Sequence, residues 1–255
     1  MKTKAFTLIE LIAVITIIAI MAGIVVYSIN DWKDDANLKK TIGYANEVKS
    51  KLGSSLLAEW RMEEGDSNKI YDLGRFQNTG TISSTTNWIS NDCPEGKYCR
   101  LFNGTSSTFI TLNNLSKIKF KTICFWIKTS GSSVNIMTKR SGATEQEGGF
   151  DIYLQGGSLG LKLYLANGSF NERISNAPIN DNQWHFVCIS LEKTSTSYDK
   201  VHFIIDGDFK KTDDVGICNF GGSHNIYLGG VYGTSWSYGT FYMDDLTIFE
   251  DSIIK

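Results

Sequence analysis

A single carboxylate stands at the start of a long apolar run, and no other residue has so clear a chemical requirement. Glu10 is followed by residues 11–29, which carry no charged side chain. In a membrane-spanning helix, an unpaired carboxylate costs on the order of 3 kcal/mol unless it is protonated or finds a partner. Glu10 is therefore expected either to find a partner or to hold a proton.

The residues that precede Glu10 form a second pattern, centred on Ala5. Lys2 and Lys4 precede Ala5, and Phe6 opens the segment Phe-Thr-Leu-Ile-Glu that ends at Glu10. A secretory signal would place its small residue after the apolar run, whereas here the small residue comes before it. This order resembles the leader of type IV prepilins.

The resemblance implies that a prepilin peptidase cleaves between Ala5 and Phe6 and that the new Phe6 amine is methylated. It also implies assembly with other pilin subunits, in which Glu10 meets the Phe6 amine of a neighbouring subunit. Pilins usually have glycine where this chain has Ala5. The alternative is an ordinary single-pass anchor whose Glu10 reaches the headgroups.

The apolar run must form the helix that positions Glu10. At roughly 1.5 Å per residue, residues 11–29 make about 28 Å of helix, enough to span a bilayer core. Lys2 and Lys4 predict a cytoplasmic N-terminus, with the chain in the bacterial inner membrane before assembly. Apolar residues then recur every three or four positions, which predicts an amphipathic continuation: Leu38, Ile42, Ala45, Val48, Leu52 and Leu56.

Carboxylates elsewhere in the chain do not form a catalytic pattern. Glycosidases need two carboxylates that flank the scissile bond. The nearest candidate run contains Glu64 and Asp66, but Lys69 stands where the pattern Glu-x-Asp-x-x-Glu needs its last acid. Neither a phosphate-binding glycine loop nor an HExxH zinc motif occurs in the sequence. The sequence predicts no catalytic residue and no enzyme.

The composition changes after the helical segment. Residues 56–255 are rich in Gly, Ser, Thr, Asn and aromatic residues, and short alternating runs such as 122–127 and 186–191 are separated by turn signals. This pattern is typical of an antiparallel sandwich. The net charge of −2 argues against a nucleic-acid partner.

Five short signatures in order resemble the laminin-G-like, concanavalin A-like jelly roll. They run from the opening strand at Trp60 to the closing strand at Phe249, and each is weak alone. The signatures lie at residues 60–64 with Asp72, Asn78 and Gly80, at 101–104, at 120–127, at 183–187 with 205–207, and at 228–230 with 243–249. We therefore expect an α+β chain: a leader at 1–5, a helix at 6–55 that crosses the membrane at 11–29, and a jelly roll at 56–255.

The same resemblance implies a structural calcium ion as the one possible cofactor. Its ligands would include Asp244, the first acid of the closing signature, and Asp72 of the opening turn. Carboxylate and carbonyl oxygens from loops are the ligands that calcium requires. The alternative is that Asp244 caps a backbone turn through a hydrogen bond.

A glycine-rich loop at residues 230–239 is the candidate recognition surface. Tyr232, Trp236 and Tyr238 stand among small polar residues, a composition typical of binding loops. Aromatic faces of this kind bind sugar rings in many lectins, so carbohydrate or another surface polymer is the expected ligand. The alternative is a hairpin whose aromatic residues pack on the sandwich or on neighbouring subunits.

The chain carries five cysteines on the side of the membrane where oxidation is permitted. Cys93 and Cys99 enclose five residues and predict a local loop disulfide. Pairing among Cys124, Cys188 and Cys218 stays open. The first two lie in strand-like runs, where buried thiols are also common.

Together these patterns predict a type IV pilin-like filament subunit that displays a lectin-like jelly roll for adhesion. Two alternatives stay open. One is a minor tip adhesin that binds carbohydrate and polymerises little, and the other is a pseudopilin of a type II secretion machine, whose pseudopilus would be periplasmic. The size of the jelly roll favours a minor or tip role, because a large domain on every subunit crowds a helical filament.

Overall fold

The computed structural model describes residues 7–83, 87–105, 108–113, 115, 120–139, 149–164, 169–194, 199–216, 224–230 and 239–254, with the backbone alone at 27–31. The chain forms one long helix and a two-sheet antiparallel sandwich, which confirms the predicted α+β class. It divides into two compact units, residues 1–40 and 41–255, which are described separately.

Helix α1 (Leu8–Leu52) begins in the first unit and ends in the second, and a 3-10 turn (Gly53–Ser55) follows it. No proline interrupts this segment, so the intrahelical hydrogen bonds continue through both units. The boundary between the two compact units lies inside the helix, between residues 40 and 41, whereas the composition of the sequence changes near residue 56. The reason is that the last turns of α1 pack on the sandwich.

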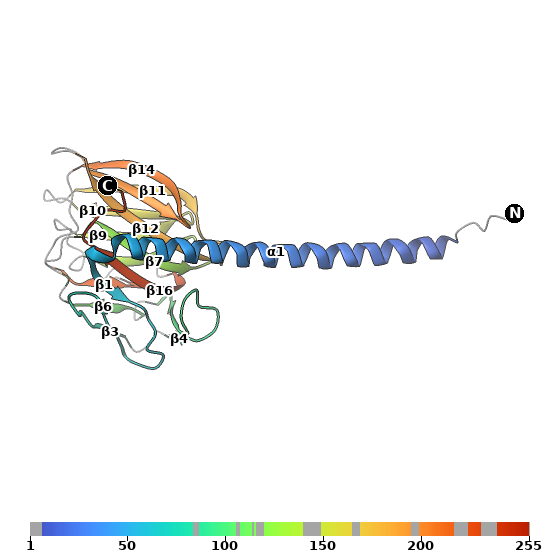
Figure 1. Cartoon of the computed structure of the whole chain (residues 1–255), viewed down its shortest axis with the longest axis horizontal. Coiled ribbons are helices and arrows are strands. Elements are labelled where there is room, and N and C mark those ends of the chain that lie inside the picture. The colour runs from blue at the N-terminus through green and yellow to red at the C-terminus, as the bar shows by residue number, and fades with distance from the viewer. Residues whose placement is uncertain are drawn as a thin grey trace. The chain divides into compact units, whose positions relative to one another are not determined.

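Sheet A contains eight strands. In spatial order these are β14 (Asp208–Gly216), β13 (Asp199–Ile205), β12 (Trp184–Lys193), β7 (Thr122–Lys128), β16 (Thr240–Phe249), β5 (Cys99–Asn103) and β4 (Asn87–Ile89), with β1 (Leu56–Trp60) paired to β16. The first and last strands of the sandwich are therefore neighbours, which closes the domain near the helix (Figure 1).

Sheet B also contains eight strands. In spatial order these are β11 (Phe170–Pro178), β10 (Ser158–Tyr164), β9 (Phe150–Gln155), β8 (Ser133–Lys139), β15 (Ile226–Leu228), β6 (Ile110–Leu112), β3 (Gly80–Ile82) and β2 (Lys69–Ile70). Alternate side chains of the two sheets meet in one apolar core that includes Trp60. Phe102 and Phe241 stack there with ring centroids 4.5 Å apart.

The opposite face of sheet A is also apolar, because the last turns of α1 cover it. Trp126 and Phe186 are buried on this face, and their ring centroids lie 5.2 Å apart. Tyr44 of the helix contacts Phe186 edge to face at 6.2 Å. A Cβ on Gly207 would lie 3.1 Å from the Tyr44 ring, so glycine lets the helix approach the turn between β13 and β14.

Candidate functional site

The N-terminal end of α1 is capped by the carboxylate that the sequence singled out. The backbone N–H of Thr7 donates to Oε2 of Glu10 at 2.9 Å, and the Thr7 hydroxyl donates to the same oxygen at 2.8 Å. In return, the backbone N–H of Glu10 donates to the Thr7 hydroxyl at 3.3 Å. This reciprocal pair is a capping box, which satisfies backbone donors that a helix start leaves unpaired.

The helix that follows is apolar on every side. Residues Leu8–Val26 have a mean hydropathy of 2.8, and none of this stretch is buried against the rest of the chain. Length and composition suffice for it to cross a membrane. Ala5 and Phe6 lie outside the described residues, so cleavage between them stays a prediction.

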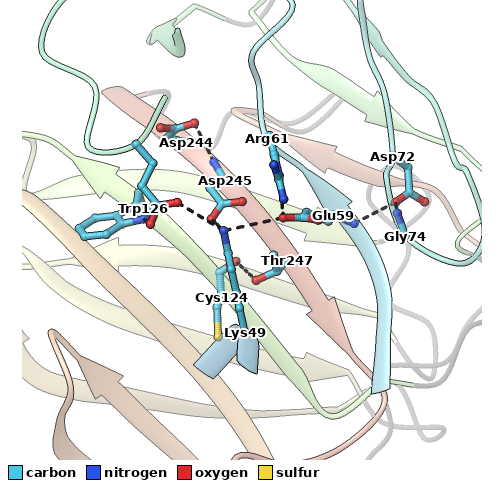
Figure 2. A network of polar contacts seen from close by, with 11 residues as sticks. Lys49, Glu59, Arg61, Asp72, Gly74, Cys124, Trp126, Asp244, Asp245 and Thr247 are labelled. Atoms are coloured by element: carbon cyan, nitrogen blue, oxygen red, sulfur yellow. Dashed lines mark hydrogen bonds and ion pairs between the residues drawn. The ribbon is translucent and has the colours of Figure 1, made fainter. Parts of the chain in front are cut away.

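In the second unit, Lys49 connects the end of α1 to two strands and one loop of the sandwich. Its Nζ forms an ion pair with Asp245 of β16 and lies 3.7 Å from Oε1 of Glu59 in β1. Glu95 accepts a hydrogen bond from the same Nζ at 3.4 Å. Arg61 adds a second cation, with its Nε 3.0 Å from Glu59. Figure 2 shows the Lys49 ammonium between Asp245 and Glu59.

Burial and charge shift the ionisation of this cluster. Burial raises the pKa of Asp245 to about 6, although the charge and hydrogen bond of Lys49 lower it. Burial raises the pKa of Asp244 to about 9, and the charges of Asp245 and Glu63 add to that rise. Burial lowers the pKa of Lys49, but the carboxylates around it outweigh burial and leave that pKa raised. Asp244 is therefore protonated at neutral pH, whereas Lys49 is charged.

Glu95 reaches this cluster from a disulfide-closed loop. Cys93 and Cys99 form the loop disulfide that their spacing predicts, with Cα atoms 5.7 Å apart. The Glu63 carboxylate accepts hydrogen bonds from the backbone of Lys97 and of Tyr98. Glu95 accepts a further bond from Nε1 of Trp126 at 3.3 Å. The loop therefore presents Glu95 to both the helix and the sheet beneath it.

Sequence reasoning did not find the Lys49 cluster. Lys49 lies next to the apolar stripe of Ala45, Val48 and Leu52 on the helix. A cation at the edge of a buried stripe, together with two adjacent acids in an otherwise apolar strand, was the available signal. The tertiary pairing of β1, β16 and the loop at Glu95 could not be deduced from the residues alone.

The two candidate calcium ligands have protein partners. Oδ1 of Asp72 accepts hydrogen bonds from the backbone N–H groups of Glu59 (2.8 Å) and Gly74 (2.7 Å), and Oδ2 accepts one from Asn78 (2.8 Å). Oδ1 of Asp244 accepts from the backbone of Asp245 at 2.9 Å, which is the turn-capping role considered as the alternative.

Both candidate carboxylates are therefore engaged in contacts within the chain. Within the described ranges, no three His, Cys, Asp or Glu side chains are grouped so that they could hold an ion. Both carboxylate oxygens of Asp72 already serve backbone amides, and the raised pKa of Asp244 favours its neutral form. Calcium at Asp72 and Asp244 stays a prediction.

The second disulfide was left open by the sequence. Cys124 of β7 and Cys188 of β12 face each other in the register and are bonded, with Cα atoms 4.2 Å apart. Cys218 lies outside the described residues. The aromatic residues Tyr232, Trp236 and Tyr238 also lie outside them, so the proposed recognition loop stays a prediction.

Two family profiles match the chain in different parts. The profile described as prokaryotic N-terminal methylation motif matches residues 1–26. The profile described as concanavalin A-like lectin/glucanases superfamily matches residues 102–253. A comparison with curated proteins found no match.

Solved structures share the fold. The binding domain of Paraclostridial Mosquitocidal Protein 1 is similar with a TM-score of 0.59 at 16% identity, over 79% of this chain and 50% of that one. The botulinum neurotoxin type G receptor-binding domain has a TM-score of 0.58 at 13% identity, over 78% and 48%. The type D receptor-binding domain has a TM-score of 0.58 at 16% identity, over 79% and 50%. The chain thus spans about half the length of these domains, and the likeness concerns the jelly roll.

Proposed function

Because this chain belongs to the concanavalin A-like lectin/glucanases superfamily and begins with a prokaryotic N-terminal methylation motif, we propose that it is a filament subunit whose jelly roll is displayed for adhesion. The N-terminal helix polymerises with other pilin subunits, and the sandwich supplies the exposed surface. The role is structural and non-enzymatic.

One observation carries the assembly role. Apart from Glu10, the helix carries no charge over Leu8–Val26 and is apolar around its circumference, and the side chains described there are exposed. An all-apolar helix needs a membrane or other apolar helices around it. A pilin subunit needs both in turn: the inner membrane before assembly, and neighbouring subunit helices afterwards.

Glu10 is the residue expected to set the register of assembly. It is the one carboxylate in the motif at residues 1–26, and in the isolated chain its Oε2 caps Thr7. Cleavage by prepilin peptidase would free a Phe6 amine four residues away in the sequence. In a filament, the amine of the neighbouring subunit then neutralises Glu10, which would otherwise be a costly charge among apolar helices.

The adhesive role rests on the second unit. Residues 41–255 form one compact body, and the superfamily is named for both lectins and glucanases, which act on carbohydrate. The neurotoxin domains of similar fold are described as receptor-binding domains, a property of those proteins. A domain of this kind, carried outside the membrane on a helical stem, suits attachment to carbohydrate or another surface polymer.

The test of assembly is a pair of substitutions in α1. Glu10→Val should insert into the membrane normally but enter filaments at least about tenfold less well than wild-type chain expressed beside it, because the axial ion pair is lost. The measurement is the ratio of variant to wild-type chain in sheared filaments. Glu47→Val, the same change at an exposed helix position, is the matched control. Equal incorporation of Glu10→Val and Glu47→Val would overturn the ion-pair proposal.

A further inference from the structure

A histidine lies between two carboxylates at the start of β12. Nδ1 of His185 lies 2.7 Å from Oδ2 of Asp206, in the turn that joins β13 to β14. Nε2 of the same ring lies 3.0 Å from Oδ1 of Asp181, in the loop before β12. The His185 side chain is only 14% exposed. One mostly buried ring therefore connects two separate loops of the sandwich.

Backbone hydrogen bonds fix the direction of both carboxylates. Oδ1 of Asp206 accepts from the N–H of Phe186 at 3.0 Å, and the N–H of Asp206 donates back to the Phe186 carbonyl at 2.9 Å. Asp206 has a positive φ of 55°, which aspartate tolerates in tight turns. Oδ1 of Asp181 accepts from the N–H of Gln183 at 2.9 Å. Both acids are thus held in place beside the His185 ring.

This arrangement requires a charged imidazole. A carboxylate only accepts hydrogen bonds, so each ring nitrogen must carry a hydrogen for both contacts to form. A neutral imidazole donates from one nitrogen and presents a lone pair at the other. Burial lowers the pKa of His185, but the hydrogen bonds and charges of Asp206 and Asp181 outweigh burial and leave that pKa above its ordinary value.

His202 of β13 does not have this requirement. Its Nε2 lies 2.9 Å from Oε2 of Glu192, but its Nδ1 lies 2.8 Å from the hydroxyl of Thr212. A hydroxyl both donates and accepts, so a neutral His202 keeps both hydrogen bonds. Of these two histidines, His185 is the one that loses a contact when it loses its proton.

Charged groups on the neighbouring strands have partners of their own. Nζ of Lys210 lies 3.0 Å from Oδ2 of Asp208, and both residues belong to β14. Lys128 of β7 forms an ion pair with Asp92. The carboxylates that act on His185 are therefore the two already described.

The same turn supports the end of α1. Tyr44 contacts Phe186 edge to face at 6.2 Å, and Gly207 leaves space for the Tyr44 ring. Burial and the charge of Glu47 raise the pKa of Tyr44 to about 12, so its phenol stays neutral. Phe186 follows His185 in the sequence, and Gly207 follows the aspartate that His185 contacts. The surface on which the helix packs is therefore continuous with that contact.

We propose that His185 is a pH-sensitive clamp that holds the loop before β12 and the turn between β13 and β14 together beside the end of α1. With its proton, the ring donates charge-assisted hydrogen bonds to Asp181 and Asp206 at once. Without that proton, the ring keeps the shorter bond to Asp206 as a neutral donor, and the lone pair of Nε2 faces the carboxylate of Asp181. The loop is then released, and the hold on the turn weakens. This inference goes beyond assembly and adhesion and depends on neither.

The clamp stabilises the folded chain on the acid side of neutrality. The pKa of His185 in the folded chain lies above its unfolded value, near 6.5. The stabilisation is therefore complete below that unfolded value and is lost as the pH rises through the folded-state pKa. Burial raises the pKa of Asp181, but the hydrogen bonds from Gln183 and His185 outweigh burial and leave it lowered, so Asp181 stays charged throughout.

Amide hydrogen exchange of the full chain in detergent tests the clamp at pH 5 and pH 8, with rates corrected for the intrinsic effect of pH. The Gln183 amide, which donates to Asp181, should lose about tenfold of its protection between the two values. In parallel, the ring carbon signals of the histidines in NMR spectra should show that His185 titrates above the pH of an unfolded peptide.

Variants separate the clamp from the rest of the fold. His185→Gln removes the titrating ring, so protection at Gln183 should no longer change with pH. Asp181→Asn should have the same effect with the ring intact, because the amide accepts from a charged ring and donates to a neutral one. His202→Gln is the matched control and should keep the change seen in the wild type. Because Asp244 also titrates, the comparison is repeated with Asp244→Asn in every chain.

Asp181→Asn alters an exposed side chain, so it keeps the test decisive even if His185→Gln does not fold. Equal protection of the wild-type Gln183 amide at both pH values would overturn the inference. So would a change in protection that persists in Asp181→Asn, or a His185 ring that titrates at or below the pH of an unfolded peptide.

Discussion

Asp244 and Asp245 are adjacent in β16, but their side chains lie in different environments. The register of β16 against β7 shifts after Asp244, and Asp245 has a positive φ of 45°, which marks a bulge. The bulge lets Asp245 reach Lys49, whereas Asp244 is fully buried, and within the described ranges its Oδ2 has no hydrogen-bond partner. Bulges often redirect a side chain in this way. The ion pair with Lys49 stabilises the charged form of Asp245, whereas Asp244 is buried in its neutral, protonated form.

Asp244 makes stability depend on pH. Its folded-state pKa of about 9 lies above the ordinary aspartate value near 4. Between these values the folded chain holds a proton that the unfolded chain releases, so the free energy of unfolding falls as pH rises. Asp244→Asn keeps the Oδ1 acceptor and removes the titration, so it should stabilise the chain by about 2 kcal/mol or more at pH 8.

Thermal unfolding at pH 5 and pH 8 measures this effect. The stabilisation by Asp244→Asn should be larger at pH 8, and the fall in unfolding temperature from pH 5 to pH 8 should be smaller than for the wild type. Asp214→Asn, at an exposed position, should leave the slope unchanged. An Asp244→Asn variant with the pH dependence of the wild type would contradict the buried-acid assignment.

At the scale of elements, the end of α1 serves as a cover for sheet A. Tyr44 packs on Phe186, Ala45 and Val48 are buried, and Lys49 closes the contact through its carboxylates. Apolar burial supplies most of the stabilisation, at about 25 cal/mol per Å². The ion pairs fix the position of the helix, because the Lys49 ammonium has three acceptors at its end.

Lys49→Met tests this contact. Methionine retains the packing of the side chain, but Asp245, Glu59 and Glu95 lose their shared cation. Breaking a mostly buried pair in this way should lower stability by about 3 kcal/mol. Lys51→Met, on the exposed side of the same turn, should change stability by less than about 0.5 kcal/mol.

Thermal unfolding of the full chain in detergent provides the measurement, and a double-mutant cycle identifies the partner. Lys49→Met combined with Asp245→Asn should cost clearly less than the sum of the single changes, because the second change removes the unpaired charge. Strict additivity would mean that Lys49 and Asp245 do not interact.

Local patterns predicted the elements, whereas long-range pairing could not be read from them. The uncharged run after Glu10 and the alternating runs at 122–127 and 186–191 predict a helix and strands because burial imposes those periods. The Cys124–Cys188 bond depends on the register of β7 against β12. Likewise, nothing near Trp126 or Lys49 in the sequence shows that the helix covers sheet A.

At the scale of the whole molecule, the chain combines a segment that cannot stay exposed to water with a domain that can. Residues Leu8–Val26 expose apolar side chains throughout, and the sandwich buries one continuous core. The first demands assembly or a membrane, and the second presents polar strand faces and loops. The proposed polymerisation through the helix and the proposed recognition through the sandwich therefore belong to different segments, and substitutions in one should leave the other intact.

Immunogold electron microscopy of the native host, with antibody raised against residues 57–255, tests the filament role most directly. The account predicts gold label on filaments: continuous label would identify a major subunit, and label confined to tips would identify a minor one. Label on the envelope with no associated filament, under conditions where the chain is expressed, would contradict the account.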